Sequence, residues 1–308
     1  RCVESVRAIV DEFVIVDTGS TDGTQDIIRK YGELYEIPFT NYVDTKNAAL
    51  KLAKTEYILF MDADEVVIAG LEFLKEHAST WTGCVVGKIV EGDDNGISNS
   101  YFRARLWRND GTRWFNGPGV HEVLDSGENT IVDHRIAVAH DHSHRTPESY
   151  NQKSVGYIKL LNDYLDAHPN DPRALFYLGR TYRDMADFIN AITYYRRYLA
   201  LNTNFRDERW QAAYDIAICW KAQGEFDKCL EACNLADEID PRRAETSLTR
   251  GRTYYALQER DKAIEHLKKA SEMPIPTDVV LFMNPRAHKE LPLDYLVLSY
   301  DKNRDYRR

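Results

Sequence analysis

Two carboxylates, Asp62 and Asp64, directly follow an apolar run over residues 57–61. A short apolar run that ends at charged residues is typical of a buried strand in a parallel sheet. In an extended chain, residues i and i+2 lie about 6 to 7 Å apart and face the same way, so both carboxylates can turn to one side. Two hard oxygen ligands suit Mg²⁺ or Mn²⁺. The pair therefore indicates a metal site, and the alternative is an acidic surface turn.

Three alternate histidines, at 140, 142 and 144, form a second candidate cluster after an apolar stretch at 136–139. If the chain stays extended there, the three rings share a face, which is a spacing that suits a metal. Two interpretations follow. One histidine joins the carboxylates at a shared ion, or the three make a separate zinc site.

A second expected strand, residues 13–17, also ends in a carboxylate, Asp17. The loop TGSTDGT follows and holds Asp22, and the alternative is that Asp17 and Asp22 merely cap the helix expected at 24–31. Further elements are expected at 35–39 (strand), from Lys46 (helix), at 57–61 (strand), from Glu65 to His77 (helix), and at 83–90 and 101–108 (strands). This alternation predicts an α/β domain with a doubly wound, mostly parallel sheet.

Composition excludes several classes of protein. The net charge of −9 argues against nucleic acid as a partner, since phosphate binding needs Lys and Arg. The acidic excess lies in residues 1–150, which hold 15 basic and 25 acidic side chains. Five scattered cysteines without a C-x-x-C pair are typical of reduced thiols, and no apolar run is long enough to span a membrane. We therefore expect a cytoplasmic protein of two domains.

Four stretches taken together resemble a known family. They are FVIVDTGSTDGT, Lys46-Asn47 before an Ala-rich helix, ILFMDADE, and RLWRNDGTRWFNGPGVHE. In this order they resemble the family 2 glycosyltransferases of the GT-A fold, an α/β, Rossmann-like fold with a mostly parallel sheet. The most similar subgroup joins this domain to tetratricopeptide repeats and includes bacteriocin S-glycosyltransferases and lipopolysaccharide-core glucosyltransferase relatives.

The resemblance implies roles for the donor-binding residues. The acid that ends the first strand, Asp17, would bind the nucleobase of a nucleotide sugar. Asp62 would be shared between the ribose and the metal, and Asp64 would be a metal ligand, with Mn²⁺ or Mg²⁺ as the cofactor. Lys46 stands where the family usually has Arg and would contact a phosphate, although it can equally be an exposed helix-start lysine. Arg103 and Arg105 would line the diphosphate or acceptor pocket. Trp107 and Trp114 are further candidates for its lining, and core packing is the alternative for these two.

The resemblance also points to the stretch GVHEVL. An inverting transferase needs a base for the acceptor proton, and Glu122 is the candidate. His121 is a secondary candidate, either as a metal ligand or as a contact to a phosphate. Because enzymes of the GT-A fold commonly complete the metal shell with a late histidine, one ligand from His140 or His142 is favoured over a separate zinc site.

Two departures from the family concern the nucleotide site. The family's first strand, with its K-N-E-type sequence, is expected upstream of residue 1, where the sequence has no initiator Met. The family also has a longer loop between the positions of Asp44 and Lys46.

Residues from about 146 onward repeat themselves. The stretch LGRTY at 178–182 recurs at 250–255, and Tyr182, Trp220 and Tyr254 are spaced by 38 and 34 residues. Ala191, Cys229 and Ala263 occupy equivalent small positions. The pattern resembles tetratricopeptide repeats, which stack helix pairs into a superhelix. We thus predict a catalytic domain at 1–145 and an all-α repeat domain at 146–308, whose inner face would hold an acceptor, a partner protein or another subunit.

The predicted function is a metal-dependent, inverting glycosyltransferase, a hexosyltransferase that uses a nucleotide-sugar donor, most plausibly a UDP-sugar, and a peptide or glycan acceptor. The first alternative is a repeat scaffold with a catalytically silent GT-A domain. The second is a sugar nucleotidyltransferase, which usually carries a Gly-rich, basic first loop that is not seen here.

Overall fold

The computed structural model describes residues 1–80, 83–93, 96–125, 127, 129–140 and 146–300. It divides into two compact units, residues 1–91 with 101–169 and residues 92–100 with 170–308. The predicted boundary at 145/146 adjoins residues outside the described part and stays a prediction. The helix that follows it, α5 (Pro147–Ala167), belongs to the first unit.

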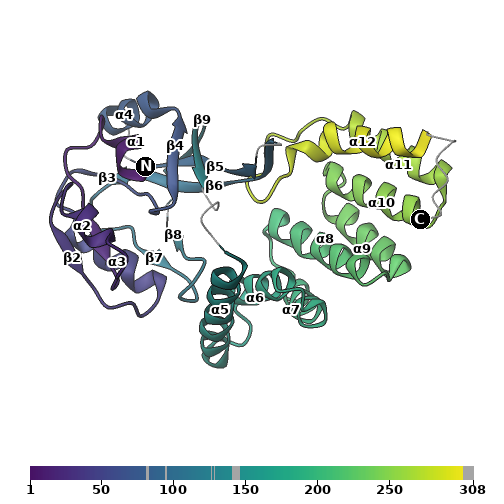
Figure 1. Ribbon diagram of the computed structural model, residues 1–308, viewed down its shortest axis with the longest axis horizontal. Coiled ribbons are helices and arrows are strands. Elements are labelled where there is room, and N and C mark those ends of the chain that lie inside the picture. Colours follow the sequence, from purple (N-terminus) through teal and green to yellow (C-terminus); the bar gives the residue numbers. More distant parts are fainter. Residues whose placement is uncertain (81–82, 94–95, 126, 128, 141–145, 301–308) are drawn as a thin grey trace. The chain divides into compact units, whose positions relative to one another are not determined.

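The first unit is built on a mixed five-stranded sheet (Figure 1) with the order β3-β6-β5-β9-β4. The strands of this sheet are β3 (Tyr57–Leu59), β4 (Glu65–Ala69), β5 (Cys84–Asp93), β6 (Gly96–Arg108) and β9 (Thr130–His140). Two small sheets pair β1 (Ile15–Asp17) with β2 (Leu34–Glu36) and β7 (Phe115–Asn116) with β8 (Val123–Leu124). The helices of this unit besides α5 are α1 (Cys2–Val6), α2 (Thr24–Ile28), α3 (Tyr42–Leu52) and α4 (Leu71–Thr80).

The α/β class is confirmed, but the sheet is mixed rather than mostly parallel. Pairs β1–β2 and β5–β9 are parallel, whereas β3–β6 and β4–β9 are antiparallel. The helix expected after Glu65 is present as α4, but its expected start is wrong. Three consecutive β-branched residues, 66–68, instead form β4 against β9, and the chain turns into α4 only after Gly70, which has a φ of 81°.

Helices cover the two faces of the sheet because successive side chains of a strand point to opposite sides. Cys84 and Trp107 pack with Leu50 of α3 in one core cluster. Their neighbours in sequence, Val85 and Leu106, pack with Leu74 of α4 in another. Burial on both faces explains why these strands are read as apolar runs in the sequence.

The second unit consists of three helix pairs and a closing segment. The pairs are α6 (Pro172–Asp184) with α7 (Phe188–Ala200), α8 (Arg206–Ala222) with α9 (Phe226–Ile239), and α10 (Ala244–Ala256) with α11 (Arg260–Glu272). A short 3₁₀ helix, η1 (Pro285–His288), and α12 (Glu290–Tyr300) follow. Of the described helices in either unit, none is both long and apolar enough to cross a membrane.

The predicted repeat is visible in the turns within the three pairs. The carbonyls of Tyr182, Trp220 and Tyr254 accept hydrogen bonds from amides five residues on, at 2.9, 3.0 and 2.9 Å. A residue in the left-handed region precedes each donor: Ala186, Gly224 and Gln258. This geometry is the usual end of a helix that reverses direction. The three residues predicted to be equivalent therefore occupy equivalent places in the structure.

Candidate active site

The turn between β3 and β4 carries the D-A-D-E motif. The amide of Asp62 donates to the carboxylate of Glu65 at 2.8 Å, and the amide of Glu65 donates to the carbonyl of Asp62 at 3.0 Å. Glu65 is fully buried and binds both terminal nitrogens of Arg105, each at 2.6 Å. The carboxylate of Glu65 therefore shapes the turn, and the carboxylates of Asp62 and Asp64 are the ones left to face the site.

Arg105 is 1% exposed, and it also donates to the carbonyl of Phe60 at 3.2 Å. Its guanidinium holds the turn from inside the domain, so the structure gives it a supporting position rather than the pocket-lining one predicted for it. Arg103, two residues earlier on the same strand face, takes the position beside the motif. Its Nη1 lies 3.0 Å from Asp62 Oδ2.

Lys46 joins Asp62 to Glu122, two residues that are 60 positions apart in the sequence. Its Nζ lies 2.8 Å from Asp62 Oδ1 and also contacts the carboxylate of Glu122, which is 7% exposed. Burial raises the pKa of Asp62, but the charges of Lys46 and Arg103 outweigh it and hold that pKa at about 2. Asp62 is thus charged at neutral pH and paired with two cations.

Helix α3 positions Lys46 through its neighbours. The helix begins at Tyr42, earlier than expected, so residues 44–46 lie in a continuous helix. The amide of Tyr42 donates to the carbonyl of Gly119 at 2.8 Å. Asn47 donates to the carbonyl of Phe115 and accepts from its amide, both at 2.8 Å. These bonds attach α3 to the hairpin that carries Glu122.

Asp64 pairs with His140 on the other side of the turn. Asp64 Oδ2 lies 3.1 Å from His140 Nε2, and the sheet register that places Glu65 opposite His140 brings them together. The other ring nitrogen, Nδ1, lies 3.6 Å from Glu91 and 3.4 Å from the Tyr101 hydroxyl. Burial lowers the pKa of His140, but hydrogen bonds with Asp64 and Glu91 raise it to about 9 overall.

Asp64 and His140 are the residues beside the turn that would hold a small divalent ion. Their Oδ2 and Nε2 atoms lie 3.1 Å apart, which is the distance of a hydrogen-bonded pair. Because a histidine binds a metal only when its ring is neutral, an ion held by both residues would displace the proton between them. Among the described residues, no group of three or more His, Cys, Asp and Glu side chains is arranged to hold an ion.

Asp17 shapes its own loop. It is 3% exposed, and its Oδ2 accepts from the amides of Gly19 and Ser20 at 2.9 Å and from Gln25 at 3.0 Å. Hydrogen bonds from Ser20 and Gln25 hold the pKa of Asp17 well below its usual range. Asp22 is exposed and accepts from the amide of Thr24, the first residue of α2, whose N-cap residue is Gly23.

Of the remaining predicted residues, His121 lies within the described part of the chain and two histidines lie outside it. His121 has a φ of 54°, and its ring packs against Tyr157 of α5 with 5.2 Å between centroids. His142 and His144 lie outside the described residues. Glu91 of β5 and Tyr101 of β6 were not predicted to lie beside the site. For Tyr101 a signal was available, because alternation along β6 places residues 101, 103 and 105 on one strand face.

Comparison with known proteins defines the class. Residues 1–136 match the model of glycosyl transferase family 2, and residues 172–205 and 244–274 match a tetratricopeptide repeat model. The chain joins a family 2 glycosyltransferase domain to tetratricopeptide repeats, as its motifs predicted.

Two relatives are each named for one of these two parts. The SPbeta prophage-derived glycosyltransferase SunS of Bacillus subtilis (strain 168) is 27% identical over 234 residues, 71% of this chain and 54% of SunS. A TPR repeat-containing protein of Synechococcus elongatus is 25% identical over 253 residues, 77% of this chain and 62% of that protein. This chain thus spans about half the length of SunS. Among solved structures, a MamA crystal structure aligns with 51% of this chain and 94% of its own, at 20% identity and a TM-score of 0.37.

Proposed function

We propose that this chain transfers a sugar from a nucleotide-diphosphate donor, a UDP-sugar in the first instance, to a peptide or saccharide acceptor with inversion at the anomeric carbon. The observation that carries the proposal is the convergence of four elements on the D-A-D-E turn. Lys46 comes from α3, Arg103 from β6, His140 from β9 and Glu122 from the β7–β8 hairpin.

Each residue has a chemical part in this proposal. Asp64 and His140 would hold Mn²⁺ or Mg²⁺ against the donor diphosphate, and Asp62 would bind the ribose. The ion would neutralise charge on the departing diphosphate. Arg103 and Lys46 would contact phosphate oxygens, and Asp17 with its loop would receive the nucleobase.

Glu122 would take the acceptor proton. The acceptor heteroatom attacks the anomeric carbon as the bond from that carbon to the diphosphate oxygen breaks, and the proton passes to the Glu122 carboxylate. Its contact with Lys46 would hold the carboxylate in place for this step.

The test is a panel of nucleotide sugars with Mn²⁺ or Mg²⁺, read by release of nucleoside diphosphate. Substituting Asp64→Ala should reduce turnover at least about a hundredfold, because the charge on the leaving group loses its main counterion. Asp64 has a side chain that is 23% exposed, so this variant should remain folded. Asp163→Ala removes an exposed carboxylate that pairs with Lys159 on α5, so it is the control and should keep near-normal turnover.

The products separate the alternatives. Pyrophosphate release would mean nucleotidyl transfer. A silent domain would give no turnover, and no rise in melting temperature with any donor and metal, although a ligand that binds only the native state must raise it. Either result would overturn the proposal. Partner binding by the repeats and a cytoplasmic location remain parts of the same proposal.

A further inference from the structure

The segment between α11 and η1 lies across the first helices of the repeat pairs. We call the surface formed by α6, α8 and α10 the first-helix face. Phe282 stacks on Phe176 of α6, with 6.3 Å between ring centroids and an interplanar angle of 18°. The guanidinium carbon of Arg180, also on α6, lies 3.7 Å from the Phe282 ring centroid. The ring of Phe282 thus contacts two side chains of α6.

Buried charged side chains on the same face bind the backbone of the segment. Asp207 of α8 accepts from the amides of Val280 and Leu281 at 2.7 and 3.3 Å. Arg243, just before α10, donates to the carbonyl of Phe282 at 2.6 Å. Glu245 of α10 accepts from the amide of Asn284 at 3.0 Å.

These three side chains have little contact with solvent. Asp207, Arg243 and Glu245 are 3%, 1% and 3% exposed. Burying charged groups is costly unless they are hydrogen-bonded. Arg243 and Glu245 pair with each other and Asp207 pairs with Arg206, and the backbone of the segment supplies further hydrogen bonds to all three. A site that recognises backbone amides and carbonyls accepts a strand of varied sequence. This is the chemistry of a peptide-binding face.

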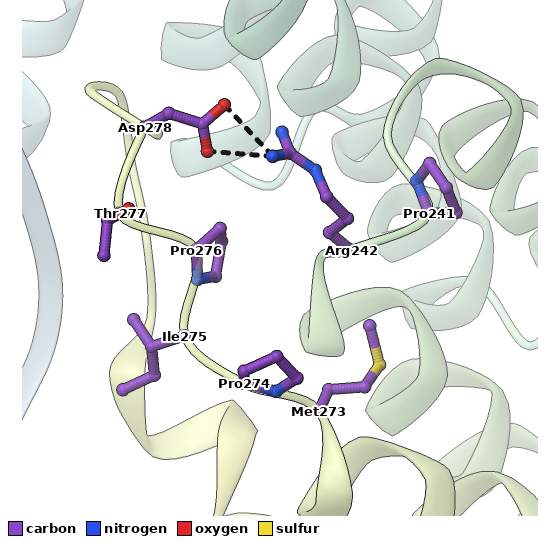
Figure 2. Close-up of a pocket in the computed structure, with 8 residues that line it drawn as sticks. All are labelled: Pro241, Arg242, Met273, Pro274, Ile275, Pro276, Thr277 and Asp278. Atoms are coloured by element: carbon purple, nitrogen blue, oxygen red, sulfur yellow. Dashed lines mark hydrogen bonds and ion pairs between the residues drawn. The ribbon is translucent and has the colours of Figure 1, made fainter.

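Asp278, earlier in the segment, forms ion pairs with two arginines. Asp278 lies 2.9 and 3.0 Å from Arg242 Nη1 and 3.1 Å from Arg206 Nη2. Figure 2 shows the contact of Asp278 with Arg242. Both residues line a hollow of about 420 Å³, together with residues that include Pro241, Pro274, Ile275 and Pro276. The Asp278 side chain is 53% exposed, so this pair is weak and open to exchange.

We propose that the first-helix face is a peptide-binding surface that the chain occupies with its own residues 277–284. A partner peptide displaces this segment when it presents an extended backbone with a carboxylate four residues before an aromatic ring, as Asp278 stands before Phe282. The predicted acceptor- or partner-binding face is therefore covered by the chain itself. This inference does not depend on the transferase activity.

The test uses a fluorescently labelled peptide of residues 277–284, TDVVLFMN. The full chain is compared with a variant in which residues 278–283 are replaced by alternating Gly and Ser, which keeps the length and removes the side chains. The peptide should bind the variant at least tenfold more tightly than it binds the unmodified chain. A peptide with Phe282→Ala should bind the variant at least tenfold more weakly than the native peptide does. Because this last change is in the peptide, it cannot unfold the protein.

A control and a second measurement complete the design. Arg286→Ala breaks only a partly exposed ion pair with Glu290 and should not increase peptide binding. In the unmodified chain, the amides of Val280 and Asn284 should exchange hydrogen as slowly as those inside α8. Equal binding of the two peptides, equal binding to a folded variant and the unmodified chain, or fast exchange at these amides would overturn the proposal.

Discussion

Lys46 is the residue on which the candidate site depends most directly. Its ammonium contacts both Asp62 and Glu122 and lies 4.8 Å from the ring centroid of Phe60. Without it, two carboxylates would face each other in a partly buried place, and repulsion between like charges would move them apart. The sequence left open whether Lys46 was an exposed helix lysine, and its contacts show that it is not.

We predict that Lys46→Ala lowers kcat/KM by about a hundredfold or more, a typical loss when a positioned charge is removed from an active site. Lys46→Arg should recover part of the activity because it keeps the positive charge. Steady-state kinetics with the active donor checks both. Lys51→Ala, an exposed lysine on the same helix, should change kcat/KM little. Activity of Lys46→Ala close to that of Lys51→Ala would contradict this role.

At the scale of elements, the pair Glu65–Arg105 connects the D-A-D-E turn to β6. Both side chains are almost fully buried and bind each other through two hydrogen bonds. Removing one partner of a buried pair leaves an uncompensated charge, whereas replacing both with apolar residues of similar size is often neutral. Single and double variants of this pair can therefore show separately how it affects the stability of the fold and how it affects the geometry of the turn.

We predict that Arg105→Met lowers the free energy of unfolding by about 3 to 5 kcal/mol. The double variant Glu65→Leu with Arg105→Met should recover most of that loss, as measured by urea denaturation. It should stay poorly active, because the Asp62 amide has lost its acceptor. Arg108→Ala, on the same strand with an exposed partner, is the control and should cost less than about 1 kcal/mol. A double variant no more stable than Arg105→Met would contradict the argument.

At the scale of the whole molecule, the repeat unit depends on close contact between the helices of each pair. A Cβ at Gly179 would lie 2.9 Å from the ring of Tyr195, and one at Gly251 would lie 2.6 Å from Leu267. Ala191, Cys229 and Ala263, the small positions predicted from the repeat, are fully buried. Small residues at these places let neighbouring helices approach closely.

We predict that Gly251→Ala destabilises the repeat unit by about 1 to 3 kcal/mol, the usual cost of overpacking a core. Gly156→Ala is the matched control. Gly156 also lies within a helix, but an added Cβ would meet no atom within 4 Å, so alanine there should stabilise α5 by about 0.5 to 1 kcal/mol. Urea denaturation followed by circular dichroism compares the two. Equal effects would show that helix propensity, and not the contact with Leu267, decides the outcome.

The sequence by itself determined the local elements and the kind of chemistry. The apolar run before Asp62, the 34-residue spacing of Trp220 and Tyr254 and the small residues between repeats are properties of single strands and helices. Each can be read from the order of residues alone, as an apolar run or as a repeat of fixed length. The glycosyltransferase and repeat classes could therefore be predicted from the sequence, and so could the place of the acidic motif in the candidate site.

Only the tertiary structure decided which of these residues meet. Whether Glu65 started a helix or a strand depended on β9, far along the chain, and that same pairing brought His140 to Asp64. Arg103 and Arg105 share a strand face, yet burial makes one a neighbour of Asp62 and the other a support for the turn. Nothing in the sequence of residues 277–284 indicates that they contact Phe176, Asp207 and Glu245. Such contacts arise from sheet register and packing between distant segments, which no local pattern encodes.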